Sequence, residues 1–304
     1  MKSQGERVHV QNITFRVARR DDYRELAQWL VAVGQAPERQ CLHTWSGQSA
    51  KALWGQLLDY WDASELCYVV ALQDGRLMGA MGSEYDRELE RGWLHGPHVA
   101  TGDWDGIATA LFDRLLAELP GCIGQLDAYL NVENVRGRRF YAQRGFTERE
   151  NLSHDFWLMP ADRVVSGDRR CSLIGKAHEA SFKRLYGALF PSAYYSGERV
   201  LHMIGQSHQV LVAPQGDEIL GFAVVSVDEG LSMGEIQFLG VHEGHRRQGV
   251  GRCLLLAAID WLLDQAGVSR ICLNVGEELV HARSLYESVG FRLRFTGVGL
   301  RKTL

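Results

Sequence analysis

Apolar and polar residues alternate along the N-terminal half in a way that predicts short strands and amphipathic helices. Alternation at every second residue is typical of a half-buried strand, whereas apolar residues three or four positions apart indicate a helix. Asp74 and Gly75 stand between two apolar runs, which is a strong signal for a hairpin turn. The pattern predicts a strand at 13–17, helices at 19–30 and 46–60, and a hairpin at 67–82.

The C-terminal half repeats this succession of elements. A long helix is predicted from Gly249 onward, because its apolar positions follow the 3.6-residue period. These positions are Val250, Leu254, Ala257, Ala258, Trp261 and Leu262. Around this helix the pattern predicts a helix at 176–189, a hairpin at 209–227, strands at 234–241 and 270–275, a short helix that contains Tyr286, and a closing strand after Gly290.

Two motifs recur at a nearly constant offset, which indicates an internal duplication. The segments "FYAQRGF" and "LYESVGF" share the pattern Tyr-x-x-x-Gly-Phe, and their tyrosines, Tyr141 and Tyr286, are 145 residues apart. Farther upstream, Gly106 matches Gly249 at an offset of 143. Chance seldom preserves one offset over two separate motifs, so we interpret the chain as one domain written twice.

The duplication predicts the fold class and the domain limits. Helices mixed with mostly antiparallel strands predict an α/β (α+β) protein, in which each copy is a mixed, mostly antiparallel sheet flanked by helices. The stretch 159–170 is polar and contains Pro and Gly, as linkers do. We therefore predict domains at 1–160 and 171–304, joined by a linker at 161–170.

The composition gives no reason to expect a polyanionic partner. Of 304 residues, 46% are hydrophobic and 23% charged, and the formal net charge is -4 with a pI near 6.3. We therefore expect neither nucleic acid nor a membrane surface as a partner. The first residues lack the apolar core of a signal peptide, and no apolar run is long enough to span a bilayer, so we expect a cytoplasmic protein.

Cysteine and histidine usage predicts neither disulfides nor a metal site. The six cysteines are scattered, with no Cys-x-x-Cys pair, and in a cytoplasmic protein we expect reduced thiols. His95 and His98 lie in one predicted strand, where they either line a pocket or belong to the core. Since no Cys or carboxylate stands near them at ligand spacing, we expect no metal.

The segment "HRRQGVGR" (245–252) places cations where a helix begins. Gly249 and Gly251 allow a tight turn and a close approach of a ligand to the backbone. The first turn of a helix has unpaired N–H groups and a partial positive charge, so each misplaced cation there costs about 0.3–1 kcal/mol. Arg246, Arg247 and Arg252 are therefore either solvated on the surface or balanced by an anion such as a phosphate, and we favour the anion.

The spacing of the glycines indicates which ligand this anion belongs to. Neither a Walker loop nor a Gly-x-Gly-x-x-Gly fingerprint is present. Instead the chain has Arg246-x-x-Gly249-x-Gly251, and then Ala-x-x-Leu-Tyr-x-x-x-Gly-Phe at 282–291. This combination resembles the GNAT superfamily of acyl-CoA-dependent N-acetyltransferases. The resemblance covers nearly all of the C-terminal half and, more loosely, the N-terminal half, and it implies two tandem GNAT-like domains.

The resemblance implies acetyl-CoA as the cofactor, with CoA as a product. In this family the pantetheine arm pairs with the backbone of the strand before the loop, and the loop amides hold the pyrophosphate. Gly240, in the middle of that strand, is expected to mark a bulge that splays two strands apart. The implied contacts are Leu239, Gly240 and Val241 for pantetheine, and Arg246, Arg247, Gln248, Gly249, Val250, Gly251 and Arg252 for pyrophosphate.

Two side chains are implied for catalysis. Tyr286 occupies the position where GNAT enzymes often keep a tyrosine beside the CoA sulfur, and it serves either as the general acid or only for packing. Glu235 looks like the general base of the histone-acetylating branch, if burial or a water relay assists it, and is otherwise a plain strand residue. The chain departs from the family at Leu279, where Asn is frequent, and at Glu243, where Pro is frequent.

The N-terminal copy is expected to have no catalytic role. Its corresponding loop carries Asp103 and Asp105 in place of the cations, before Gly106. Carboxylates at a helix start cap its N–H groups and would repel a pyrophosphate. Trp93 stands in place of the candidate base, and Tyr141 would remain as a packing residue only.

These features predict an acetyltransferase whose C-terminal domain acetylates a primary amine of a small molecule or a peptide. The alternatives are an acyl-CoA-binding sensor without catalysis and an interaction module without cofactor. Substrate choice is expected to depend on an aromatic segment, whose members either wall an acceptor cleft or belong to the core: Tyr186, Phe190, Tyr194 and Tyr195. The acceptor stays open, as does the choice between a monomer and a homodimer.

Overall fold

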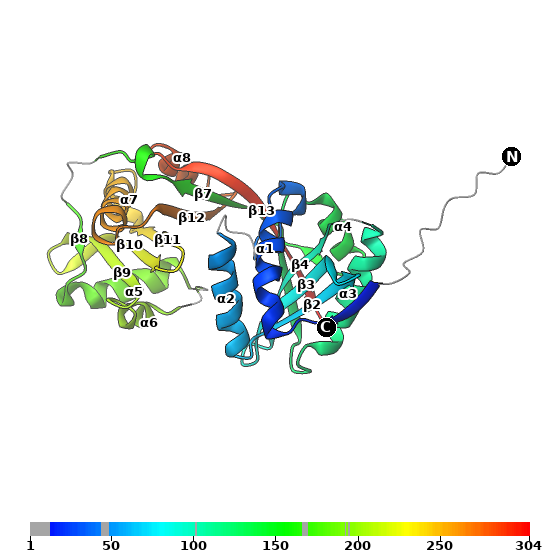
Figure 1. Ribbon diagram of the computed structural model, residues 1–304. Helices are drawn as coiled ribbons and strands as arrows, with labels where there is room; N and C mark the ends of the chain where they lie inside the picture. The colour runs from blue at the N-terminus through cyan, green and yellow to red at the C-terminus, as the bar shows by residue number, and fades with distance from the viewer. Residues whose placement is uncertain (1–12, 44–48, 101, 166–169, 192, 194) are drawn as a thin grey trace. The chain divides into compact units, whose positions relative to one another are not determined.

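A computed structural model describes residues 13–43, 49–100, 102–165, 170–191, 193 and 195–304 of the chain (Figure 1). The chain folds into two compact units. Unit 1 comprises the chain up to Leu152 together with Thr296–Leu304, and unit 2 comprises Ser153–Phe295.

Unit 1 is built on a mixed, mostly antiparallel sheet. Its strands pair in the order β1, β2, β3, β4, β5 and the C-terminal part of β13, and β6 pairs with the end of β13. Only β4 and β5 run parallel among these pairs of described strands. The bounds are β1 Ile13–Val17, β2 Leu66–Gln73, β3 Arg76–Asp86, β4 Arg91–Val99, β5 Gln125–Asn131, β6 Thr147–Glu148 and β13 Arg292–Thr303.

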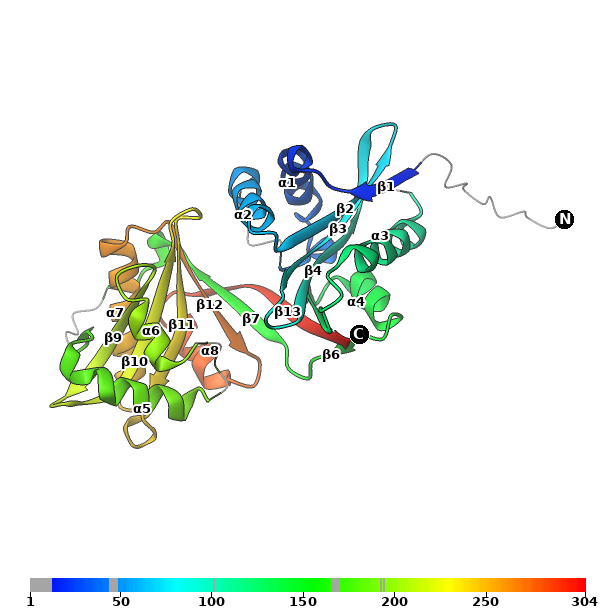
Figure 2. The same ribbon diagram turned by 90° about the horizontal axis from the view of Figure 1, so that it is seen from below.

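Helices cover both faces of the unit 1 sheet. Short 3₁₀ turns at Arg20–Asp22 and Pro37–Arg39 flank the first helix. One face packs against the first two helices and the other against the next two (Figures 1 and 2). The helices are α1 Tyr23–Val33, α2 Ala50–Asp62, α3 Trp104–Glu118 and α4 Val135–Ala142.

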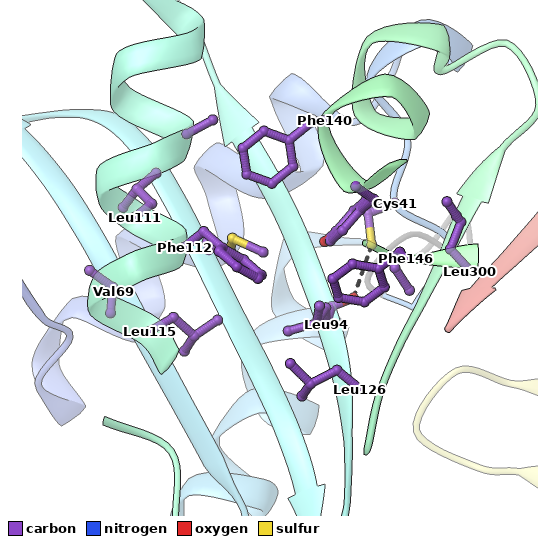
Figure 3. Packing of buried hydrophobic residues seen from close by; sticks show 14 of the residues in the cluster. Cys41, Val69, Leu94, Leu111, Phe112, Leu115, Leu126, Phe140, Phe146 and Leu300 are labelled. Carbon is purple, nitrogen blue, oxygen red and sulfur yellow. Dashed lines mark hydrogen bonds between the residues drawn. The ribbon is translucent and has the colours of Figure 1, made fainter. Parts of the chain in front are cut away.

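The core of unit 1 lies between the sheet and α3 and α4. Phe112 and Phe140 meet edge to face with ring centroids 5.9 Å apart, and Phe146 packs beside them (Figure 3). Leu300, from the last strand of the chain, is fully buried in the same cluster. The final residues of the chain are therefore part of the core of the first unit.

Unit 2 repeats this plan. Its strands pair in the order β7, β12, β11, β10, β9 and β8, and only β11 and β12 run parallel among these pairs of described strands. The bounds are β7 Ser153–Leu158, β8 Ser172–Leu173, β9 His208–Gln215, β10 Glu218–Asp228, β11 Met233–Val241 and β12 Arg270–Gly276.

Helices again cover both faces of the unit 2 sheet. α5 (Glu179–Leu189) and α6 (Gly197–His202) pack on one face around the buried Phe222. α7 (Val250–Asp260) packs on the other face, together with α8 (Val280–Glu287), and ends in a π-helical turn at Trp261–Gln265. The predicted fold class, a mixed and mostly antiparallel sheet flanked by helices in each half, is confirmed.

The two units do not coincide with the predicted sequence ranges. β7 lies before the predicted linker, yet it pairs with β12 in unit 2. β13 belongs to the C-terminal half, yet from Gly297 onward it pairs with β5 in unit 1. Each half thus supplies a strand to the unit built mainly from the other half. The domain limits 1–160, 161–170 and 171–304 therefore describe the two copies of the duplicated sequence, and as domain boundaries they stay a prediction.

Candidate functional site

A strand pair in unit 2 opens where the resemblance implies the pantetheine arm. β11 is paired with β12 only over Met233–Glu235, and a register shift follows because Gln237 is bulged. From Phe238 to Val241, β11 is paired with β10 on one side, and among the described strands none is paired with its other side. That edge of β11 is therefore available for a ligand that pairs as an added strand would.

The bulge lies three residues before the predicted position. The sequence predicts it at Gly240, but Gly240 pairs regularly with Phe222. A Cβ atom on Gly240 would lie 2.8 Å from Leu189 Cδ1 and 2.9 Å from the Phe222 ring. The prediction for Gly240 was wrong, because this glycine makes room for α5 packing rather than for a strand irregularity.

The start of α7 has no side-chain cap from its N-cap residue. Its N-cap residue, Gly249, has φ +80° and makes no side-chain cap, so the first N–H groups of the helix receive no side-chain acceptor from it. Gly251, in the first turn of α7, faces the opened strand pair, since a Cβ there would lie 3.6 Å from Val241 and 3.5 Å from Leu285. The donors and the free strand edge therefore border the same space.

The predicted cations at this helix start have different surroundings. Arg246 donates from Nε to the Val241 carbonyl at 3.3 Å, and Arg252 donates to Ser288 Oγ at 2.7 Å. Arg247 is exposed, with the unusual φ of +63°. Gln248 donates to the Gly244 carbonyl at 3.2 Å. Arg246 and Arg247 lie in the loop itself, whereas Arg252 connects α7 to the end of α8.

The corresponding helix start in unit 1 is capped by the protein itself. Asp103 is the N-cap of α3, and its Oδ1 accepts a hydrogen bond from the Gly106 N–H at 3.1 Å. Asp105 in the first turn pairs with Arg136 at 3.2 Å. The α3 start is thus satisfied by carboxylates, as its sequence predicted, whereas the α7 start has no such cap.

The two duplicated tyrosines also differ. In unit 1 the Tyr141 hydroxyl is fully buried and donates to the Gly96 carbonyl at 2.7 Å. In unit 2 the Tyr286 ring packs against Phe156 and Phe291, but its hydroxyl has no hydrogen bond to any described residue. Burial raises the pKa of Tyr286 to about 12. Its hydroxyl is therefore protonated at neutral pH and uncommitted.

Glu235 is largely buried at the closed end of the same strand pair. Burial raises the pKa of its carboxyl, although weak hydrogen bonds from Gln237 at 3.4 Å and Ser226 at 3.5 Å oppose the shift. The Gln237 amide oxygen in turn accepts from His208 Nε2 at 3.1 Å. A raised pKa makes Glu235 a better base than an ordinary glutamate.

A second carboxylate, Asp155 of β7, lies near Glu235 and was missed from the sequence. The registers place Glu235 beside Cys272 and Asp155 beside Asn274, so all four side chains leave the same face of the sheet. Burial and the Glu235 charge raise the pKa of Asp155 to about 7, and its Oδ1 is buried without a partner. The only sequence signal was a polar residue in a strand of the other half.

The predicted acceptor-cleft aromatics separate into two groups. Tyr186 is only 1% exposed, its ring packs on Phe222 and Phe238, and its hydroxyl donates to the Tyr195 carbonyl at 3.0 Å. It is therefore a core residue. Phe190 is half-buried against Phe238, and Tyr195 is half-buried with its ring 6.2 Å from His208. Tyr194 lies outside the described residues.

Unit 1 has a cavity of about 360 Å³ between the end of β4 and the starts of α3 and α4. His98 lines this cavity together with Pro97, Trp104 and Asn134. Burial lowers the pKa of His98 to about 4, so the imidazole is neutral. His95 is a core residue whose Nδ1 is bonded to the Tyr68 hydroxyl at 2.9 Å.

Two further findings concern the described part of the chain as a whole. No group of three or more His, Cys, Asp or Glu residues among the described positions has the geometry of a metal site. None of the described helices is both long and apolar enough to cross a membrane.

Comparisons with known proteins agree with this geometry. Residues 178–291 match the family model "Acetyltransferase (GNAT) family". A mycothiol acetyltransferase of Salinispora tropica is 36% identical over 83 residues, and one of Renibacterium salmoninarum is 33% identical over 86. These segments are 26% and 27% of this chain, and they span 27% and 25% of the length of the two relatives. The likeness to these relatives therefore covers about a quarter of their length.

Solved structures extend the likeness of fold to nearly the whole chain. A GCN5-related N-acetyltransferase of Sphaerobacter thermophilus has a TM-score of 0.73 at 16% identity and covers 96% of both chains. A tandem GNAT protein from the clavulanic acid biosynthesis pathway has a TM-score of 0.63 at 18% identity, and covers 96% of this chain and 98% of its own. The family match thus assigns residues 178–291, rather than the whole chain, as a GNAT acetyltransferase domain.

Proposed function

We propose that the protein is an N-acetyltransferase in which unit 2 transfers an acetyl group from acetyl-CoA to a primary amine of a small molecule or peptide. The observation that carries this proposal is the opening between β11 and β12, which borders the uncapped start of α7. Unit 1 offers a contrast, because Asp103 caps the equivalent helix. The start of α3 is thus capped by a side chain of the protein, whereas the equivalent start of α7 is not.

The residues of unit 2 fit the cofactor. The α7 amides, with Arg246 and Arg247, would hold its pyrophosphate, because donors at a helix start favour an anion. The free edge of β11 at Leu239, Gly240 and Val241 would pair with its pantetheine arm. Arg252 has a supporting part, since it is bonded to Ser288. When bound, acetyl-CoA supplies an activated acyl group and a thiolate leaving group.

Glu235 is the proposed general base. Its carboxylate would accept the proton that the acceptor ammonium must lose before its nitrogen can attack. The largely buried position strengthens it for this task, because burial raises its pKa. Asp155, whose pKa is raised to about 7, would be partly ionised at neutral pH, and its negative charge near the base would help to attract a cationic acceptor.

Tyr286 is the proposed general acid. Its hydroxyl proton would pass to the departing CoA sulfur, whose own pKa of about 8.5 lies below that of the phenol. The hydroxyl is free for this task, in contrast to the Tyr141 hydroxyl, which is bonded to a carbonyl. Backbone N–H groups of β11 would polarise the acetyl carbonyl.

The acceptor is proposed only as a class. Phe190 and Tyr195 remain candidates for the acceptor cleft, and Tyr186 supports them from the core. The curated relatives matched over short segments are named mycothiol acetyltransferases, so small-molecule amines are the first class to test.

A thiol-release assay on the full chain tests the proposal. Acetyl-CoA is incubated with a panel of primary amines, and free CoA is measured with a thiol reagent. Release that depends on an amine and is lost in Glu235→Gln supports an acetyltransferase. Tight CoA binding without release from any amine would instead indicate an acyl-CoA sensor, and no CoA binding would indicate an interaction module.

A further inference from the structure

A row of directly paired residues crosses the unit 2 sheet at the closed end of the opened strand pair. His208 of β9 is paired with Ser226 of β10, Ser226 with Glu235 of β11, and Glu235 with Cys272 of β12. These four strands are neighbours in the sheet (Figure 2). Side chains of directly opposite residues leave the same face, so His208 lies on the face of the proposed base, two strands away.

Gln237 connects His208 with Glu235. This residue is the bulge of β11, because the register with β10 moves from Ile236 directly to Phe238. Its amide Nε2 donates to Glu235 Oε2 at 3.4 Å, and its Oε1 accepts from His208 Nε2 at 3.1 Å. A bulge takes the extra residue out of the regular pairing and can direct its side chain anew. The irregularity thus accompanies an amide that lies between the base and the histidine.

The hydrogen bonds of Ser207, His208 and Gln237, here called the donor series, have one consistent direction. The Gln237 amide oxygen can only accept, so His208 Nε2 carries the proton and the NH₂ end of the amide faces Glu235. Burial lowers the pKa of His208, so its imidazole is neutral at neutral pH and its Nδ1 accepts from Ser207 Oγ at 2.8 Å. Both ring nitrogens are therefore engaged, and every donor of the series points toward the base.

The surroundings of Glu235 make these donors important. Asp155 of β7 and the Cys272 thiol of β12 lie near it, and burial together with the Glu235 charge raises the pKa of each. Arg294 and Arg270 act electrostatically on these two neighbours, respectively. Burial also disfavours the Glu235 carboxylate itself, so side-chain hydrogen bonds are what favours its ionised form.

The cysteine beside Glu235, Cys272, is a free thiol. Three further cysteines are also free: Cys41, Cys67 and Cys122. Cys171 and Cys253 form a disulfide, with their Cα atoms 6.5 Å apart, so the expectation of reduced thiols was wrong for this pair. Spacing could not reveal the pair, because 82 residues separate its members. Cys272 adds a neutral group to the surroundings of the base, since the raised pKa of its thiol keeps it protonated.

The equivalent row in unit 1 lacks both the base and the histidine. There Glu84 of β3 is paired with Leu66 of β2 and with Trp93 of β4. In register, Leu66 thus occupies the position of His208, and Trp93 that of Glu235. The copy without the proposed base is also without the histidine of the donor series, as expected if these donors serve the base.

We propose that Gln237 and His208 are positioning residues for the acetyl transfer. The donor series fixes the Gln237 amide, and this amide holds the Glu235 carboxylate in place and in its ionised form for the acceptor ammonium. Neither residue touches the reacting atoms in this assignment. The inference rests on the proposed function, because it concerns the support of the same base.

The pH dependence of kcat/KM for the acceptor amine tests this role on the full chain. Gln237→Leu removes a donor to Glu235, so the pKa of that carboxyl should rise and the acid limb of the profile should move up by roughly one pH unit. A purely structural role would lower kcat without moving the limb. His208→Leu should move the limb in the same direction by less, because the released amide still donates in part of the molecules. His208→Gln, whose side-chain amide also donates, should restore part of the wild-type profile.

A double variant tests whether His208 acts through Gln237. His208→Leu combined with Gln237→Leu should move the limb no further than Gln237→Leu alone, since residues that act in one series are not additive. Additive shifts would overturn the series. His202→Leu, which changes an exposed histidine of α6 that is bonded to the Glu198 carbonyl, is the matched control and should leave the profile unchanged.

The outcomes separate this inference from the proposed function. If the wild type transfers acetyl groups and Gln237→Leu keeps the acid limb in place, the positioning role is refuted and the proposed function stands. If the wild type releases no CoA with any amine, the proposed function fails and the positioning role fails with it. Urea unfolding checks the fold of each variant, and His208→Leu, which leaves β11 intact, provides the same test if Gln237→Leu does not fold.

Discussion

At the scale of single residues, the duplication allows a candidate site residue in unit 2 to be compared with its counterpart in unit 1. Tyr141 and Tyr286 occupy the same motif, but only Tyr141 has a hydrogen-bond partner for its hydroxyl among the described residues. The motif alone therefore cannot assign a catalytic role, because the tyrosine of the same motif in unit 1 is a packing residue. The surroundings of the hydroxyl distinguish the two tyrosines.

The tyrosine pair yields a matched prediction. Tyr286→Phe should lower kcat roughly a hundredfold, as for a lost general acid, and change the KM for acetyl-CoA little. Tyr141→Phe should leave kcat unchanged but lower the free energy of unfolding by about 1–2 kcal/mol, because the Gly96 carbonyl loses its buried donor. Steady-state kinetics and urea unfolding measure both. Equal kinetic effects in the two variants would contradict the assignment.

The carboxylates Glu235 and Asp155 predict a pH effect. A base must be deprotonated to act, so the acid limb of the kcat/KM profile reports Glu235. The charge on Glu235 helps to raise the pKa of Asp155 to about 7, and the ionised Asp155 is proposed to attract a cationic acceptor. Asp155→Asn should therefore remove the part of the rise in kcat/KM near pH 7, and an unchanged profile would contradict this role of Asp155. Glu235→Gln should remove the limb.

At the scale of elements, local patterns predicted much of the structure. The duplicated motifs, the hairpins and the start of α7 at Val250 follow from residues that are near one another in the sequence. Capping by Asp103 was also predictable, because the cap and its donor are three residues apart. Signals of this kind reflect local conformational preferences, and those preferences persist in the fold.

Elements that depend on distant partners were not predictable. β7 carries Asp155 to unit 2, but nothing in its own six residues specifies β12 as its neighbour. The bulge at Gln237 and the core position of Tyr186 likewise depend on packing against other elements. Strand partners and side-chain burial are decided by tertiary contacts. The parts of the site that the sequence analysis missed are therefore those that depend on residues distant in the sequence.

At the scale of the whole molecule, each unit contains a strand from the opposite half of the sequence. Leu300 in β13 completes the unit 1 core, and Phe156 in β7 is fully buried in unit 2. Neither half of the sequence alone contains all strands of a complete unit. Tests of binding and stability therefore belong on the full chain.

Stability of the chain should depend on pH through Glu84 of unit 1. Burial raises the pKa of Glu84 from about 4.5 to about 7, so the folded state favours the protonated form. Stability is therefore full below pH 4.5 and declines as the pH rises toward 7. Glu84→Gln removes this penalty and should raise the free energy of unfolding at about pH 8 by at most about 3 kcal/mol, with little change at about pH 4.

Urea unfolding at the two pH values measures the Glu84 effect. Glu88→Gln, which changes an exposed glutamate in the turn after β3, is the control and should have no pH-dependent effect. A Glu84→Gln variant that is no more stable than the wild type at the higher pH would contradict the burial of an ionised carboxylate.

The most direct test of the account is the affinity of the full chain for CoA at moderate salt. The uncapped α7 start and its arginines predict binding with a Kd on the order of micromolar, and an Arg246→Glu, Arg247→Glu double variant should lose it, because carboxylates there repel the diphosphate. Asp103→Ala, which changes the α3 start, should leave the affinity unchanged. An absence of CoA binding by the wild type, or undiminished binding by the double variant, would contradict the account.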